Sequence, residues 1–142
     1  MNLDDITVGI SQAIYNEFGE DYTIYSDDIS QGMSEPCFLV LPINSSRELI
    51  VGNRYESRNP YDIHYFPQKE NDRSEINTVE ARLYVALEYI TVNDGLVRGI
   101  NMNSQVTDGV LHFFVDYNMF LNKKLFAAEE MQKLSVTVKL KE

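Results

Sequence analysis

Residues 54–66 read RYESRNPYDIHYF, and this stretch decides how the chain folds. Successive side chains of a strand point to opposite faces of a sheet, so the stretch separates into two sets. One set would face a core and comprises Tyr55, Ser57, Tyr61, Ile63 and Tyr65. Asp62 and His64 would face the other way. Pro60 cannot donate a ladder hydrogen bond, so we expect a bulge or an edge position there.

The residues before this stretch, from 22 onwards, also predict strands. YTIYSDDI is a short alternating segment, and CFLVLPI is a nearly all-apolar strand. The turn-rich NSS then leads into RELIVG, which we expect to be the hairpin partner of CFLVLPI. Residues 66–74, FPQKENDRS, would form a loop into the next element.

Two amphipathic helices are predicted, one before and one after these strands. Apolar residues recur at three- and four-residue steps over residues 3–18 and again over residues 74–90. Asp4 and Asp5 suit the positive N-terminal end of the first helix, and Gly19 can end it. Ser74 is the expected cap of the second helix. Each helix has one apolar stripe, so each should lie on a sheet.

Residues 91–122 predict a hairpin and then a long strand. Asp94-Gly95 would supply the positive φ of the first tight turn, and Asp108-Gly109 that of a second. The following run, VLHFFVDYNMFL, is longer than the usual strand of about 5–6 residues. One face of this run is fully apolar and the other is half apolar. The apolar face comprises Leu111, Phe113, Val115, Tyr117, Met119 and Leu121. Such a strand would be central in the sheet or covered by a partner.

Residues 123–142 would form a polar connector and a last strand. SVTVKLKE alternates the apolar Val136 and Val138 with polar residues, and its lysines suit an edge strand or one added to a neighbouring subunit. Together these elements predict a single α+β domain over 1–142, a mostly antiparallel mixed β-sheet with two amphipathic α-helices packed on it. A chain of this length buries about 68% of its unfolded surface and needs no disulfide or metal to fold.

The composition restricts the possible partners. The chain carries 22 acidic and 12 basic residues, a formal charge of −10, which disfavours nucleic-acid phosphates and anionic membrane surfaces. One cysteine cannot form an intramolecular bridge, and no segment approaches the roughly 20 apolar residues of a membrane span. We therefore expect a protein made in the cytoplasm without an anchor of its own.

Few residues of the sequence suggest a catalytic or metal-binding role. Cys37 opens an apolar strand, where a thiol is usually a small buried hydrophobe. His64 shares a strand face with Asp62, and His112 shares one with Asp116, so each pair resembles an acid–base pair. Surface or satisfied polar contacts are the commoner explanation of such pairs. The spacing of the two histidines matches no compact metal-ligand motif, and there is no glycine-rich phosphate loop. We predict no catalytic residue, no metal site and no cofactor.

Three long segments carry a family resemblance. QGMSEPCFLV, GNRYESRNPYDIHYFP and GLVRGINMNSQVTDGVLHFFVDYN resemble the tail terminator, or tail-completion, proteins of phages and prophage elements from Gram-positive bacteria. The resemblance covers about residues 3–123. It implies an α/β tail-terminator fold and a structural, non-enzymatic role in the virion at the tail–neck junction, with assembly in the host cytoplasm.

The resemblance also implies partners. Proteins of this family cap the finished tail tube as a ring, generally hexameric, which halts polymerisation of the tube protein and presents a surface to the head–neck connector. In contractile tails the ring also meets the sheath protein, and genomic DNA passes through the bore without sequence-specific binding. A closed ring needs two different, complementary patches on each subunit. An acidic bore would repel DNA, although the charge also serves solubility.

The residues of the subunit interface are a hypothesis based on the positions of charged side chains in the sequence. Arg47, Arg54 and Arg58 could pair with acidic residues of the next subunit, and the last strand could reach across through Val136 and Val138. The acidic candidates are Glu20, Asp21, Asp27 and Asp28. Three other hypotheses about the function stay open: another neck or connector component, a small monomeric acidic inhibitor that mimics nucleic acid, and a hydrolase using His64 or His112.

Overall fold

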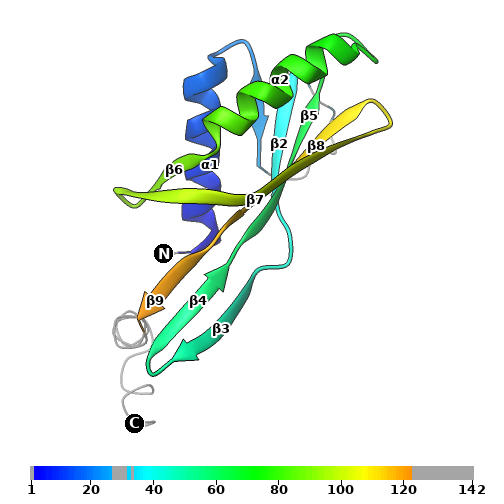
Figure 1. The fold of residues 1–142 in the computed structure, drawn as a ribbon. Helices are drawn as coiled ribbons and strands as arrows, with labels where there is room; N and C mark the ends of the chain where they lie inside the picture. The colour runs from blue at the N-terminus through cyan, green and yellow to red at the C-terminus, as the bar shows by residue number, and fades with distance from the viewer. Residues whose placement is uncertain (1, 27–31, 33, 123–142) are drawn as a thin grey trace.

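The computed structural model describes residues 2–26, 32 and 34–122. The described part of the chain contains two helices and nine strands (Figure 1). Their bounds are α1 Leu3–Phe18, β1 Thr23–Tyr25, β2 Cys37–Pro42, β3 Ser46–Val51, β4 Arg54–Arg58, β5 Pro60–Phe66, α2 Arg73–Ala86, β6 Tyr89–Val92, β7 Gly95–Thr107, β8 Val110–Tyr117 and β9 Met119–Asn122.

Six strands form the main sheet in the order β1-β2-β5-β8-β7-β6. β1 and β2 run parallel, and the other neighbours are antiparallel. Both helices contribute to one hydrophobic core with the same face of β2, β5 and β8. The expected α+β class, a mostly antiparallel mixed sheet with two helices packed on it, is confirmed (Figure 1).

The predicted hairpin between CFLVLPI and RELIVG is wrong. β2 pairs with β5, with Val40 opposite Ile63, whereas β3 pairs with β4 in a separate sheet of order β3-β4-β9. The physical reason is burial: β2 is buried over its first four residues, so its neighbour must also offer a buried face. β5 has such a face, while every residue of β3 is exposed.

Two long ribbons connect the main sheet to the three-stranded sheet, which we call the arm (β3, β4 and β9). β4 passes into β5 across Asn59, and β8 passes into β9 across Asn118. At this crossing the Asn59 side chain donates to the Tyr117 carbonyl at 2.9 Å, and the Tyr117 amide donates to the Asn59 carbonyl at 3.0 Å. The irregularity expected at Pro60 is therefore a change of sheet one residue earlier. The arm extends away from α2 (Figure 1).

The first helix follows its prediction at both ends. Asn2 caps it, because its side chain accepts from the Asp5 amide at 3.2 Å while Asp5 Oδ2 accepts from the Asn2 amide at 3.0 Å. Gly19 ends it with φ of 84°. The buried stripe of α1 consists of Ile6, Gly9, Ile10, Ile14 and Phe18.

The second helix differs from its prediction at both ends. Its cap is Asp72, whose side chain accepts from the Glu75 amide at 3.1 Å, and not Ser74. It ends at Ala86 rather than residue 90, and Ile90 lies in β6 opposite Val97. Ile90 is 1% exposed, so a strand buries it as completely as the expected helix would have. Neither described helix is long and apolar enough to cross a lipid bilayer.

Two tight turns shape β6, β7 and β8. Val92 pairs with Gly95, and positive φ falls on Asn93 (50°) and Asp94 (68°), as the primed hairpin turn requires. The prediction had placed it at Asp94-Gly95, one residue too far along. The second turn has positive φ at Asp108 (52°) and Gly109 (77°), as predicted.

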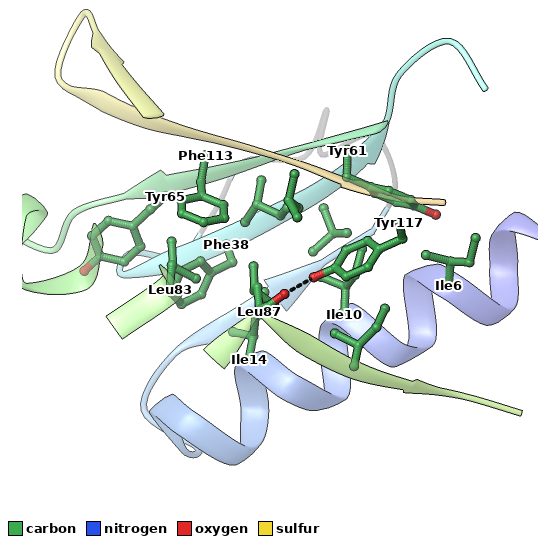
Figure 2. Close-up of a cluster of buried hydrophobic side chains, with 14 of the residues drawn as sticks. Ile6, Ile10, Ile14, Phe38, Tyr61, Tyr65, Leu83, Leu87, Phe113 and Tyr117 are labelled. Atoms are coloured by element: carbon green, nitrogen blue, oxygen red, sulfur yellow. Dashed lines mark hydrogen bonds between the residues drawn. The ribbon is translucent and has the colours of Figure 1, made fainter. Parts of the chain in front are cut away.

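Tyrosine hydroxyls tie the core to backbone groups. Tyr117, fully buried in β8, donates to the Leu87 carbonyl at 2.6 Å (Figure 2). Tyr61 donates to the Leu3 carbonyl at 3.0 Å and so fixes the start of α1 against β5. Burial raises the pKa of Tyr117, which keeps its hydroxyl a hydrogen-bond donor. These contacts join the helical layer to the sheet.

Candidate functional site

A polar cluster lies on the face of the main sheet opposite the helical core. His64 of β5 and His112 of β8 are direct cross-strand partners, and Asp62 precedes His64 by two residues on the same face. His64 Nε2 lies 2.9 Å from Asp62 Oδ2, and His112 Nδ1 lies 3.2 Å from the same oxygen. The centroids of the two imidazole rings are 4.3 Å apart. One carboxylate is therefore shared by two imidazoles.

The cluster is partly buried, and its two histidines favour the ionised form of Asp62. The side chains of Asp62, His64 and His112 are 18%, 19% and 23% exposed. Burial opposes ionisation of Asp62, but hydrogen bonds and charge attraction from both histidines outweigh it, and the pKa of Asp62 lies below its ordinary value. The other carboxylate oxygen, Asp62 Oδ1, is buried without a hydrogen-bond partner among the described residues.

The sequence predicted only half of this arrangement. The Asp62 and His64 pair forms as the strand parity indicated. The expected pair of His112 with Asp116 does not form, because residues four apart on one strand stand about 13 Å apart along it. Asp116 accepts instead from Asn101 Nδ2 at 2.8 Å. The three ligand atoms of Asp62, His64 and His112 all lie within 4.8 Å of one another, an arrangement that could hold a metal ion. The spacing of the histidines in the sequence gave no sign of this grouping, and the signal that could have found it is the β5–β8 register.

Cys37 occupies a position unsuited to nucleophilic chemistry. Its side chain is fully buried, as a cysteine at the start of an apolar strand is expected to be. Burial, and secondarily the charge of Glu35, raises the pKa of Cys37 to about 11. The thiolate is the reactive form of cysteine, so a raised pKa lowers its reactivity.

The arm carries all three arginines of the predicted interface. Arg54 lies over the Phe120 ring at 4.3 Å from its centroid, and Arg58 pairs with Glu56 at 3.1 Å. Arg47 lies in β3, and all three arginines are exposed. The structure thus brings these cations together on one projecting sheet.

Of the acidic candidates, Glu20 and Asp21 are exposed just beyond the C-terminal end of α1. That end of α1 lies at the opposite end of the molecule from the arm (Figure 1). The remaining candidates, Asp27, Asp28, Val136 and Val138, lie outside the described residues.

A cleft of about 620 Å³ separates the beginning of α1 from the arm. Its walls include Leu3 and Ile6 of α1, Arg47 of β3, and Met119 and Leu121 of β9. Neither His64 nor His112 lines this cleft. The histidine cluster and this cleft are therefore separate features of the described residues.

These features define a class of protein: a small α+β domain whose most prominent surface is a projecting, exposed sheet. The sequence matches the family described as Phage tail terminator protein over residues 5–128. The match covers most of the chain, so the chain belongs to this family and is a structural component of phage tails. The comparison with curated proteins found no match.

Proposed function

We propose that this protein caps the finished tail tube as a closed ring, hexameric in the general form of its family. The ring ends polymerisation of the tube protein, presents the attachment surface for the head–neck connector, and in a contractile tail also meets the sheath protein. Genomic DNA passes through its bore without sequence-specific binding. Membership of the terminator family supports this role, and no bond is made or broken in it.

The observation that carries the proposal is the exposure of the arm. Every residue of β3 is exposed, and three consecutive apolar residues, Leu49, Ile50 and Val51, are 52%, 49% and 67% exposed. β3 is also an edge of its sheet among the described strands. An apolar edge strand that is left uncovered promotes association with other chains, so natural proteins cover or charge such edges. A neighbouring subunit or tail protein would cover this one.

The charge distribution supports a head-to-tail arrangement. The arm, which carries the three arginines, and the C-terminal end of α1, which Glu20 and Asp21 follow in sequence, lie at opposite ends of the molecule (Figure 1). A ring closes only through unlike patches, because each subunit must present one patch forward and the other backward. Complementary charge at the two ends would orient each copy against the next.

The proposal is tested by placing charge on the arm in the virus itself. Ile50→Lys combined with Val51→Lys should yield overlong tails, because desolvating two lysines opposes coverage of β3 and an uncapped tube continues to grow. Tail lengths are measured by electron microscopy of negatively stained particles. The matched control is Val85→Lys combined with Leu96→Lys, since both residues are 74% exposed and lie outside the arm.

Two outcomes would count against this role. Tails of normal length carrying normal heads in the arm variant would remove the arm from the interface and leave the proposal without its main support. Tails of normal length that lack heads would instead indicate a connector component that takes no part in ending the tube. A folded variant, checked by circular dichroism, is required in both cases.

A further inference from the structure

We propose that Asp62, His64 and His112 form a binding site for one divalent transition-metal ion of the zinc class. The site would lie on the face of the main sheet that points away from the helices. It joins the central strands β5 and β8 and lies outside the arm. Binding to the isolated chain is therefore separable from ring formation.

The geometry is close to that of a bound ion. Zinc binds imidazole nitrogen and carboxylate oxygen at about 2.0–2.2 Å, so two ligands of a tetrahedral site stand about 3.3–3.5 Å apart. Asp62 Oδ2 is 2.9 Å from His64 Nε2 and 3.2 Å from His112 Nδ1. These two distances are a few tenths of an ångström shorter than those of a bound site, and all three ligand atoms lie within 4.8 Å of one another, so small side-chain movements would make room for the ion. Side-chain rotation alone can supply them.

The backbone holds these three ligands in place. His64 and His112 are paired residues of antiparallel strands, and their neighbours Ile63 and Phe113 are fully buried in the core. The strands therefore fix both Cα positions before any ion arrives. Ligands held on regular elements lose less conformational freedom on binding than ligands on loops.

The donor set selects the kind of ion. Two imidazoles and one carboxylate suit zinc and other late first-row divalent ions better than calcium or magnesium, which prefer oxygen ligands. Three protein ligands leave a fourth position for water or another group. The ligands are 18–23% exposed, so an ion can reach them from solvent.

One further feature favours a cation at this point. Asp62 Oδ1 is buried without a hydrogen-bond partner among the described residues, and a cation bound by the carboxylate would offset the cost of burying it. Each imidazole would bind through the nitrogen that faces Asp62 and carry its proton on the opposite nitrogen.

The test uses the full-length chain without a histidine tag, stripped of metal by a chelator. Cobalt(II) serves as the probe, because a four-coordinate ion gives a visible absorption band, and zinc is then used to displace it. We expect one ion per chain. His64→Gln and His112→Gln should each weaken binding at least a hundredfold. Asp116→Asn is the matched control, because Asp116 lies on the same face of β8 and bonds to Asn101; it should bind normally.

A second measurement does not depend on the variants folding. The chain has only two histidines, so the imidazole signals of a ¹⁵N-labelled wild-type sample are few. As zinc is added, the nitrogen signals of both rings should change together until one ion per chain is bound. The proposal is overturned if neither cobalt nor zinc binds at stoichiometric concentration, if the glutamine variants bind like the wild type, or if only one ring responds.

Discussion

At the scale of single residues, the ionisation of Asp62 depends on groups that only folding brings together. Its carboxylate accepts from two imidazoles on neighbouring strands while one of its oxygens is buried and unbonded among the described residues. The hydrogen bonds exist only in the folded chain, because His112 is 50 residues away in sequence. Folding therefore favours the ionised form of this group, and its contribution to stability must depend on pH.

Asp62→Asn should lower the free energy of unfolding by about 1–2 kcal/mol at pH 7 in metal-free buffer, because hydrogen bonds to an ionised group are lost. The pKa of Asp62 is depressed in the folded state, so its stabilisation is present above the ordinary value of 3.8 and is lost as the pH falls below that value. Urea unfolding at a series of pH values measures the difference. A gap between variant and wild type that stays constant from pH 7 to pH 3 would contradict this account.

At the scale of elements, the close packing of α1 on β6 depends on Gly9. A Cβ built on Gly9 would lie 2.6 Å from the Thr91 carbonyl oxygen, a backbone atom that cannot rotate away. The helix therefore approaches the strand more closely than any other residue would permit. Helix propensity alone would favour alanine here by about 1 kcal/mol.

Gly9→Ala should consequently destabilise the protein by about 1–3 kcal/mol, since overpacking against backbone outweighs the gain in propensity. Val8→Ala is the matched control, because Val8 is in the same helix and 66% exposed, and it should change stability by less than about 0.5 kcal/mol. Thermal or urea unfolding followed by circular dichroism measures both. A stabilising Gly9→Ala would contradict this account, because it would show that β6 can move away from the helix without cost.

Local patterns predicted the elements better than their partners. The stripe of α1, the alternation of β5 and the turn at Asp108-Gly109 all depend on residues close in sequence, and the structure has them as expected. The partner of β2 depends on burial across the whole sheet, so proximity in sequence wrongly favoured β3. The end of α2 was missed because Ile90 meets the core in either conformation.

The difference between local patterns and strand pairing also explains why the sequence predicted only part of the polar cluster. Strand parity placed Asp62 and His64 on one face, which required only β5. Bringing His112 to the same oxygen required the register between β5 and β8, a contact between residues 50 apart. Parity alone made Asp116 the nearest acid to His112, whereas the cross-strand partner of Asp116 is Pro60. The position of His112 in the cluster thus depends on the pairing of β5 with β8, which no local sequence pattern encodes.

At the scale of the whole molecule, the proposed ring would bring the arm of one subunit to the end of α1 of the next. Among the described residues Arg54 forms no ion pair and lies over Phe120, whereas Arg58 already pairs with Glu56. Arg54 is therefore the arginine of β4 that we propose for the contact with a neighbouring subunit. Asp21 is exposed beyond α1 and is a suitable partner for it.

Arg54→Glu should impair tail termination, because a negative arm would meet the negative end of the next copy. Each contact would lose roughly 1 kcal/mol, and a closed ring repeats the loss at every contact. Arg54→Gln is the control, since it also removes the contact with Phe120 but adds no negative charge, and its defect should be smaller. Asp21→Arg combined with Arg54→Glu should restore normal tail lengths in electron micrographs, because the exchanged charges again attract. A double variant no better than Arg54→Glu alone would show that these two residues do not meet, and would require a different pair of surfaces to close the ring.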